Sequence, residues 1–476
     1  MVVQHNMQAA NANRMLNVTT GQQAKSTEKL SSGYRINRAA DDAAGLSISE
    51  KMRKQIRGLD KASSNAEDGV SSVQTAEGAL TEVHSMLQRM NELATQSANG
   101  TNSTTDRSAI QDEISQLTTE IDRVAETTKF NETYLLKGGD GTKLEYMKGH
   151  DAGLKGTLTD GTTTATFKVA AGALDEGKSV TIGGKDYTIG SAVADVQDAV
   201  DKLTAADDKV TVNDKTYTYV AANSKAPGGQ TVTTAGWVLD GDKTSTTGTK
   251  LTIANGDKVT TTPKTGASAS YTADEMDNGV SKADPSIISA EKAVSLMKDE
   301  LIAANKVGVT NGTVEITGNP AYDKDNGVTF NINKGSAEVA NKLSFSLHVG
   351  SDADMTNKIT VGIETMNSSY LGIKGLNVND DSGIAGTYAI DAISDALQKV
   401  SDQRSSLGAV QNRLEHTIDN LDNVVENTTS AESRIRDTDM AKEMVNYSKN
   451  NILAQAGQSM LAQANQSNQG VLSLLQ

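Results

Sequence analysis

Residues 52–98 read MRKQIRGLDKASSNAEDGVSSVQTAEGALTEVHSMLQRMNELATQSA, and this stretch decides the fold. Steps of seven residues along it land each time on an apolar side chain: Met52, Leu59, Ala66, Val73, Leu80, Leu87 and Ala94. Such a repeat is typical of a long helix that packs along a helical neighbour. A helix over about residues 43–98 would be roughly 80 Å long. The stretch therefore predicts an extended helical bundle, because a single compact domain does not need such a rod.

Two further apolar stripes complete this bundle. Residues 99–102 interrupt the first helix, Thr105 or Asp106 is the expected N-cap of the next one, and apolar residues recur at helical spacing up to Val124. A third seven-residue stripe lies more than 250 residues downstream, at Ile393, Val400, Leu407, Leu414 and Leu421. The bundle therefore joins the two ends of the chain, and the middle is expected to be an insertion.

Each end of the chain adds a thinner amphipathic helix. Its apolar positions are Val3, Met7, Ala10, Leu16 and Val18 at one end, and Val445, Ile452, Ala456, Met460, Val471 and Leu474 at the other. Two such narrow stripes would leave apolar surface uncovered if they paired only with each other. We expect other copies of the chain to cover an assembly core of Val3, Met7, Leu16, Val445, Ile452, Met460 and Leu474. A monomeric antiparallel coiled coil with frayed tails is the alternative.

The middle of the chain has a different composition. Between about residues 140 and 345, Gly and Thr become frequent, and β-forming residues alternate with polar ones around turn pairs such as Gly183-Gly184 and Asn213-Asp214. Two short amphipathic stretches, residues 191–203 and 290–304, are expected to be helical. The insertion is therefore expected to be mixed α and β, and a division into two lobes near residue 280 is left open.

Composition narrows the class of protein. The chain has 476 residues, no Cys, and 60 acidic against 45 basic side chains, which gives a net charge of −15. The lack of Cys excludes disulfides and thiolate chemistry, and the negative charge argues against binding to nucleic acid or anionic membranes. No apolar run reaches the roughly 20 residues that cross a bilayer, and the N-terminus lacks the pattern of a cleaved signal. All 4 Pro lie between Pro227 and Pro320, so both ends are free to form long helices.

Signals for catalysis or ligand binding are weak. Residues 172–179, GALDEGKS, match the phosphate-loop pattern, but a strand-like stretch follows where that loop requires a helix. The 5 His are far apart and form no HExxH pair, and the acidic clusters lack the ligand spacing of a calcium-binding loop. We expect no catalytic residue, no cofactor and no metal site.

Several motifs closely resemble those of bacterial flagellins. They are LSSGYRIN at residues 30–37, DDAAGL at 41–46, the segment from SNAEDG to GTNS at 64–103, EIDRV at 120–124, FNETYLL at 130–136, and VQNRLEHTIDNL, AESRIRDTDMAKEMV and GVLSLLQ in the last 70 residues. The resemblance covers about 140 N-terminal and about 130 C-terminal residues, and the middle shows no comparable match.

This resemblance implies a multidomain fold. Its long α-helical coiled-coil or bundle core is formed by both chain ends, and a mixed α+β outer domain rich in Thr and Gly is inserted into it. Residues 1–42 and 435–476 would be inner-core terminal helices, and residues 43–140 and 345–434 an outer-core helical bundle with a β-hairpin region. Residues 141–344 would be a variable surface insertion. Gly33 would end the first helix, and Asp41 or Asp42 would cap the second.

The implied function is that of a structural subunit, without enzymatic activity, which polymerises into the bacterial flagellar filament for motility. The implied partners are other copies of the chain, a flagellar export chaperone, the type III export apparatus, and the hook-associated and cap proteins, with neither nucleic acid nor membrane insertion. The protein would be secreted and located in the flagellum. Two alternatives stay open: a hook–filament junction protein of the same family, and a flagellin whose insertion binds carbohydrate.

A further implied partner is the Toll-like receptor by which vertebrate innate immunity senses flagellins. The family's receptor-binding pattern Leu-Gln-Arg-x-x-Glu-Leu-Ala is matched by residues 87–94. By this resemblance the receptor-binding residues are Gln88, Arg89, Leu93, Gln96 and Glu113, while Asn91 stands where an arginine is often found. Packing inside the rod is the alternative role for Leu93, and a solvated helix face is the alternative for Arg89.

Overall fold

The structure is a computed structural model that describes residues 6–380 and 382–473, with the backbone alone for residues 468–473. The chain forms two compact units. The first contains the described residues up to Gln74, then Phe345–Val361 and those from Leu407 onward. The second contains the described residues of Thr75–Ser344 and Gly362–Ser406. Two long helices, α2 and α7, contribute to both units, and each unit is described with its own part of them.

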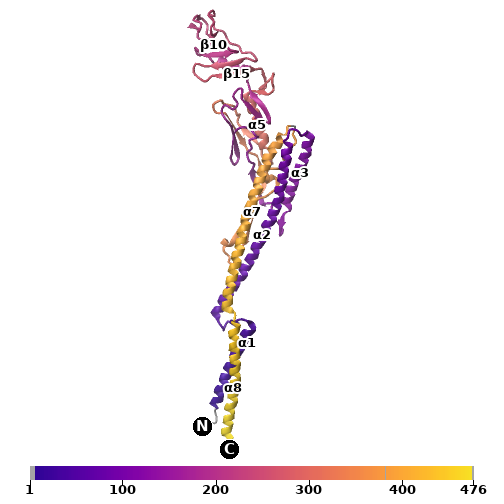
Figure 1. The fold of residues 1–476 in the computed structure, drawn as a ribbon, viewed down its shortest axis with the longest axis vertical. Helices are drawn as coiled ribbons and strands as arrows, with labels where there is room; N and C mark the ends of the chain where they lie inside the picture. Colours follow the sequence, from indigo (N-terminus) through magenta and orange to yellow (C-terminus); the bar gives the residue numbers. More distant parts are fainter. Residues whose placement is uncertain (1–5, 381, 474–476) are drawn as a thin grey trace. The chain divides into compact units, whose positions relative to one another are not determined.

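Long helices occupy both ends of the described chain (Figure 1). The helix predicted over residues 43–98 is α2, and the third predicted stripe lies on α7, so the predicted helical core is confirmed. The long helices are α1 (Met7–Ser32), α2 (Ala43–Ser97), α3 (Thr104–Thr127), α7 (Ile384–Arg436) and α8 (Met440–Ser473). The shorter ones are α4 (Val193–Asp201), α5 (Ala290–Asn305), α6 (Ser368–Leu371) and the 3-10 helix η1 (Met355–Asn357).

Capping groups set the helix boundaries. Gly33 ends α1 in the left-handed conformation, with φ of 78°, and its N–H donates to the carbonyl oxygen of Lys29. The Asp42 carboxylate accepts from the Gly45 N–H at 2.8 Å in the first turn of α2, as predicted. The N-cap of α3 is Ser103, which forms a reciprocal capping box with Asp106. The expected cap at Thr105 or Asp106 is therefore wrong, because the serine hydroxyl two or three residues earlier reaches the free amides first.

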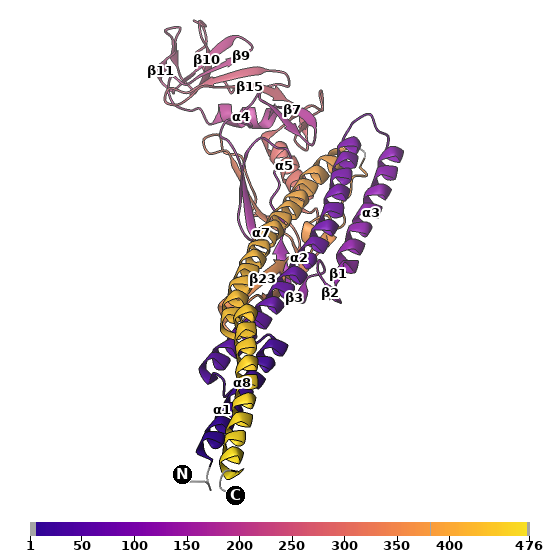
Figure 2. The ribbon, with the colours of Figure 1, turned by 60° about the horizontal axis from the view of Figure 1, so that its bottom comes forward.

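In the first unit, α1 pairs with α8 in antiparallel fashion, and both Figures 1 and 2 show the two helices side by side. Next along the chain, Leu59 and Ala62 of α2 are buried against Leu421 of α7. A second cluster joins Ala66 and Leu414 to Ile359 of a β-hairpin, β22 (Leu343–His348) with β23 (Lys358–Ile363). These contacts fall on the predicted seven-residue stripes.

In the second unit, α2, α3 and the start of α7 bury their apolar stripes against one another. The fully buried side chains include Leu80, Leu87, Ile114, Ile393 and Val400. Buried Arg107 donates to the carbonyl oxygen of Ser97 at 2.9 Å and to that of Asp380 at 3.2 Å, and so fastens the α2–α3 turn to the segment before α7.

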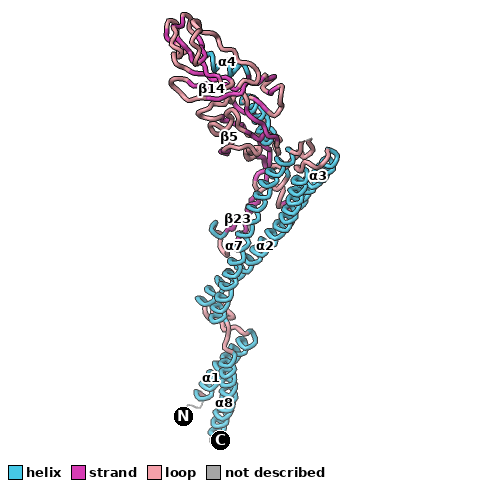
Figure 3. Tube along the Cα trace, turned by 45° about the horizontal axis from the view of Figure 1, so that its top comes forward, coloured by secondary structure: helices cyan, strands magenta, loops and turns pink. Residues whose placement is uncertain are grey.

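The predicted strand-rich insertion lies between α3 and α7, and Figure 3 shows the strands gathered there. Its first strands are the short hairpin β1 (Lys129–Phe130) with β2 (Thr133–Tyr134) and the longer pair β3 (Gly139–Tyr146) with β21 (Ser336–Asn341). The rest of the insertion forms an inner and an outer lobe, each defined by its own apolar cluster.

The inner lobe packs two sheets and α5 around one core. Phe167 and Phe330 face each other across β5 and β20, with ring centroids 6.3 Å apart. Met297 and Leu301 of α5 join this core. One sheet has the strand order β19 (Glu315–Thr317), β20 (Val328–Asn333), β5 (Thr164–Val169), β4 (Thr157–Asp160); the other has β16 (Met276–Asp277), β17 (Val280–Ser281), β18 (Ile287–Ile288), β7 (Lys185–Ile189), β6 (Ser179–Ile182).

The outer lobe is a six-stranded sheet with α4 on one face. Val196 and Val200 of α4 pack with Val210, Val259 and Trp237 of the sheet. The strand order is β13 (Gly236–Leu239), β10 (Lys215–Val220), β9 (Lys209–Val212), β14 (Lys258–Thr262), β15 (Ala269–Asp274), β8 (Ser191–Ala192), and a separate pair joins β11 (Ser224–Lys225) to β12 (Thr231–Val232).

The outer lobe is nested within the inner one. Strand β18 pairs in parallel with β7, through Ile287 and Thr188, although the whole outer lobe lies between these strands in sequence. A division of the insertion near residue 280 is therefore wrong, because inner-lobe strands precede and follow the outer lobe. The predicted hairpins with turns at Gly183-Gly184 and Asn213-Asp214 are present as β6–β7 and β9–β10.

Candidate assembly surface and receptor-binding helix

The two terminal helices pair closely in antiparallel fashion along their length. Asn6 caps α1 by accepting from the Ala9 N–H at 2.9 Å, and its side-chain amide donates to the carbonyl oxygen of Ala464 at 3.3 Å. Further along, half-buried Leu16 lies against Gly457, where a Cβ would meet the Leu16 Cδ1 at 3.4 Å. The glycine lets the two backbones approach, but it adds no apolar surface of its own.

Most of the apolar side chains of this pair face outward. We name as the terminal apolar surface the exposed residues Met7, Met15 and Val18 of α1 and Met440, Met444, Val445, Ile452, Leu453 and Met460 of α8. Val445, Ile452 and Met460 are 67%, 66% and 64% exposed. Of the predicted assembly core, Val3 and Leu474 lie outside the described residues.

The terminal apolar surface is hollowed at two places. One hollow of about 510 Å³ lies on α8 and is lined by Met444, Val445, Ser448, Lys449, Ile452 and Leu453. Another of about 640 Å³ lies between the two helices, between Met15 of α1 and Met460 of α8. Contiguous exposed apolar surface of this kind is typical of places where another molecule packs.

Several side-chain contacts join the segments that link the terminal helices to α2 and α7. The Arg436 guanidinium lies over the Tyr34 ring, 4.9 Å from its centroid, and pairs with Glu50 at 3.0 Å. Arg35 donates from its side chain to the carbonyl oxygen of Ile435 and from its N–H to that of Arg436. Sequence patterns do not predict the residues of this junction, because its partners are about 400 residues apart.

The receptor-binding residues suggested by resemblance fall into two groups. Arg89 donates to Glu113 of α3 at 2.9 Å and pairs with Glu92 at 3.1 Å, and the hydrogen bond to Glu113 raises the pKa of Arg89. Gln88 and Gln96 are exposed on the same helix. Leu93 is only 2% exposed, so its side chain packs inside the bundle. A polar patch of Gln88, Arg89, Gln96 and Glu113 remains accessible.

The phosphate-loop-like segment has a structural role. Strand β6 begins at Ser179, the last residue of the segment, so a strand stands where a phosphate loop requires a helix. Instead, Asp175 accepts from the Tyr322 hydroxyl at 2.9 Å, and Glu176 accepts from the Ser191 hydroxyl at 2.5 Å and from the Thr272 N–H. Burial raises the pKa of Glu176. The segment thus ties the outer lobe to the inner one.

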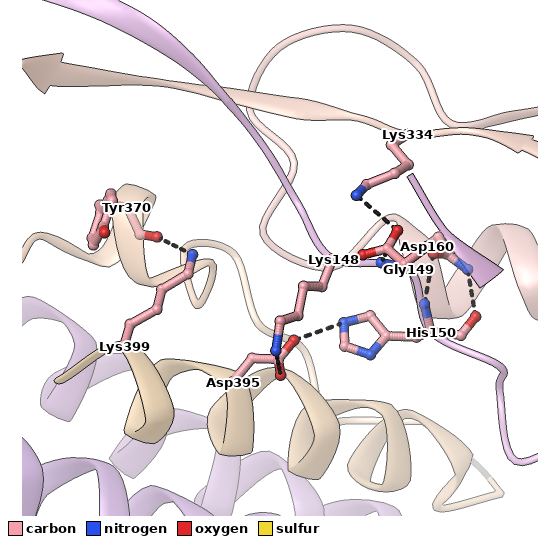
Figure 4. A network of polar contacts seen from close by, with 9 residues as sticks. Lys148, Gly149, His150, Asp160, Lys334, Tyr370, Asp395 and Lys399 are labelled. Carbon is pink, nitrogen blue, oxygen red and sulfur yellow. Dashed lines mark hydrogen bonds and ion pairs between the residues drawn. The ribbon is translucent and has the colours of Figure 1, made fainter. Parts of the chain in front are cut away.

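A polar network holds the first residues of the insertion on α7 (Figure 4). Lys148 pairs with Asp395 of α7 at 2.9 Å, and His150 lies 3.9 Å from the same carboxylate. Nearby, the half-buried Lys399 donates from its ammonium group to the carbonyl oxygen of Tyr370 at 2.6 Å, and the same group lies 4.9 Å from the Tyr370 ring centroid. Burial lowers the pKa of Lys399, and burial together with nearby carboxylates raises the pKa of Tyr370 to about 12. Lys148, His150 and Lys399 therefore contact other parts of the fold and have a structural role.

Within the described residues, no cluster of three or more His, Asp or Glu side chains is placed to hold a metal ion. No helix in the described part of the chain is long and apolar enough to cross a membrane.

Comparison with known proteins matches both helical ends of the chain. The model of the bacterial flagellin N-terminal helical region matches residues 3–140, and that of the C-terminal helical region matches residues 390–475. A flagellin of Clostridium tyrobutyricum is 41% identical over 472 residues, which are 98% of this chain and 100% of that protein. The chain belongs to the bacterial flagellin family. A flagellin of Bacillus subtilis is 34% identical over 100% of both chains.

Flagellins are the structural subunits of the flagellar filament, and this member is therefore a filament subunit. The two matched regions contain α1 to α3 at one end and most of α7 with α8 at the other. Most of the insertion lies between the matched regions. Among solved structures, the FliC of Burkholderia pseudomallei is 21% identical, covering 72% of this chain and 99% of its own, with a TM-score of 0.27.

Proposed function

We propose that copies of this chain join into the filament through the terminal apolar surface on α1 and α8. The observation that carries the proposal is the outward position of Val445, Ile452 and Met460, each about two-thirds exposed in the single chain. Burial of such a side chain contributes about 1.5–3 kcal/mol, so neighbouring copies that cover several of them gain enough to offset the entropy of association. If the α1 surface of one copy packs on the α8 surface of the next, the contact is head-to-tail. Such contacts can repeat along a filament without closing into a ring.

Removal of α8 tests this proposal. A chain that lacks residues 440–476 is expected to stay soluble and monomeric, because the bundle of α2, α3 and α7 has its own buried core. Electron microscopy after salting-out should show filaments for the full chain and none for the truncated one. Far-UV circular dichroism checks that the remaining helices are folded. Normal filaments from the folded, truncated chain would refute the proposal.

The same proposal assigns each part of the chain to a layer of the filament. Residues 1–42 with 435–476 would form the inner core of the filament, residues 43–140 with 345–434 the outer core, and residues 141–344 the surface insertion. The concentration of strands between α3 and α7 supports this division. As a family property, we further propose secretion through the type III export apparatus with an export chaperone, and contact with hook-associated and cap proteins. The protein would act without catalysis.

We also propose that the polar patch of Gln88, Arg89, Gln96 and Glu113 binds the flagellin-sensing Toll-like receptor. Arg89 supports this role because its guanidinium is half exposed yet held in place by two carboxylates. A side chain that is oriented before binding loses less entropy in a complex. Leu93 would act by packing α2 in the bundle, since it is buried in the single chain.

An arginine substitution separates contact from packing. Arg89→Ala is expected to weaken binding to the purified receptor ectodomain by roughly tenfold, as for an arginine at the centre of an interface. Arg123→Ala is the matched control, because Arg123 is also an exposed helical arginine paired with a glutamate, Glu120. Surface plasmon resonance gives both affinities. Equal affinity of Arg89→Ala and the unchanged chain would contradict the receptor assignment.

A further inference from the structure

Two oppositely charged stripes lie on the first unit, outside the terminal apolar surface. Residues 51–61 of α2 carry five cations and one anion, although the whole chain has a net charge of −15. We name as the basic stripe Lys54, Arg57 and Lys61, which are exposed. Their spacing of three and four residues places them on one face of the helix. Leu59 and Ala62 lie on another face, against α7.

The second stripe lies on α7. Residues 415–426 carry four anions and neither Lys nor Arg. We name as the acidic stripe Glu415, Asp419 and Glu426, which are exposed and spaced four and seven residues apart. The buried residues of this part of α7, Leu414 and Leu421, face α2 and the hairpin.

The two stripes do not neutralise each other within the chain. In the described structure, the ion pairs nearest in sequence to the basic stripe join Glu50 to Arg53 and to Arg436. Lys54, Arg57 and Lys61 have no carboxylate at ion-pair distance among the described residues, and the acidic stripe has no cation there. Both sets of charges are therefore free to meet a partner.

We propose that the basic stripe of one copy docks on the acidic stripe of a neighbouring copy. This inference rests on the proposed function, because it needs copies that polymerise. The occupant is a second copy of the chain, because each copy carries one basic and one acidic stripe, on different helices. A contact between unlike surfaces is head-to-tail, so it can repeat without closing into a ring. The stripes attract the incoming copy and fix its position along its neighbour, while the terminal apolar surface supplies most of the binding free energy.

Charge reversal tests the contact in the full-length chain. One variant carries Lys54→Glu, Arg57→Glu and Lys61→Glu; the other carries Glu415→Lys, Asp419→Lys and Glu426→Lys. Elongation from wild-type filament seeds, followed by light scattering and electron microscopy, should be about tenfold slower for each, since like charges then face each other. The matched control for the first variant is Lys185→Glu, Lys215→Glu and Lys243→Glu, which makes the same change in net charge on exposed insertion residues. This control should elongate at nearly the wild-type rate.

Mixing the two reversed variants gives the sharpest result. One variant has two acidic stripes and the other two basic ones, so an equal mixture restores complementary contacts between alternating copies. The mixture is expected to elongate several times faster than either variant alone. Triple variants that elongate like the control, or a mixture no faster than its components when both have the circular dichroism of the wild type, would overturn the inference. A wild-type chain that forms no filament at all would instead overturn the proposed function.

Discussion

Two glycines in the long helices differ in the space around them, which is crowded at Gly386 and open at Gly78. This difference decides whether a methyl group added there stabilises or destabilises the protein. A Cβ at Gly386 of α7 would lie 2.8 Å from the backbone nitrogen of Ala98 and 3.0 Å from the carbonyl oxygen of Ala94. These are backbone atoms at and just after the C-terminal end of α2, and they cannot move aside alone. A Cβ at Gly78, in the middle of α2, would meet nothing within 4 Å.

Alanine at these two positions should therefore have effects of opposite sign. Gly78→Ala is expected to stabilise the protein by up to about 1 kcal/mol, because alanine loses less backbone entropy in a helix. Gly386→Ala is expected to destabilise it by about 1–3 kcal/mol, since α2 and α7 must move apart. Urea unfolding monitored by circular dichroism measures both. A stabilising Gly386→Ala would show that the close helix approach is absent.

At the scale of one element, the start of α3 depends on a cap that the sequence pattern placed two or three residues too late. Ser103 accepts from the Asp106 N–H, and the Asp106 carboxylate accepts in return from the Ser103 N–H and hydroxyl. Thr105 already lies within the helix. Patterns of this kind locate a cap only to within a turn, because several polar residues precede the first apolar one.

The cap can be tested by two neighbouring substitutions. Ser103→Ala is expected to cost about 1 kcal/mol of stability, whereas Thr105→Ala should change little. The hydrogen bonds from Ser103 lower the pKa of Asp106. A lowered pKa means that this carboxylate stabilises the fold at neutral pH and loses the effect as the pH falls below about 4. The stability difference between Ser103→Ala and the wild type should therefore shrink at acid pH, as measured by urea unfolding.

The terminal helices give a second prediction at this scale. Ile452→Asp is expected to leave the melting temperature of the monomer nearly unchanged, because the side chain is 66% exposed. It should prevent seeded filament growth, because a charge would be buried without a partner in the polymer. Gln458→Asp, another exposed position of α8, introduces the same charge and is the control. Equal growth of both variants would place the contact elsewhere.

At the scale of the whole molecule, the nested outer lobe is the part best able to unfold separately. Its apolar cluster around Val196, Val210 and Trp237 is distinct from that of the inner lobe. Trp237 is the single Trp of the chain, and it is buried in a T-shaped contact with the Tyr219 ring. Its fluorescence therefore reports on the outer lobe, whereas the far-UV signal at 222 nm reports mainly on the long helices.

The two signals should follow different unfolding curves. We expect the Trp237 fluorescence transition to fall at a lower urea concentration than the helical transition, because the outer lobe has the smaller core. The circular dichroism signal should remain largely unchanged through the first transition. Coincident curves would mean that the lobes and the bundle unfold as one cooperative unit.

The sequence by itself determined the helical core, the strand-rich insertion and the family. These features rest on local or periodic signals: the seven-residue stripes on α2 and α7, Gly33 at the end of α1, and turn pairs such as Gly183-Gly184. Each is encoded within a few helical turns or one hairpin, so no knowledge of distant partners is needed.

Only the tertiary structure decided which of the marked residues are accessible and which distant segments meet. Leu93 is buried, whereas Arg89 is exposed beside Glu113. The outer lobe lies in sequence between β7 and β18, which pair with each other. Arg436 contacts Tyr34 and Glu50, which are about 400 residues away in sequence. A repeat identifies a helix and its apolar stripe, but the partner of that stripe depends on which remote segment packs there. That choice is made by the whole chain, because burial and pairing between segments hundreds of residues apart have no local signature in sequence.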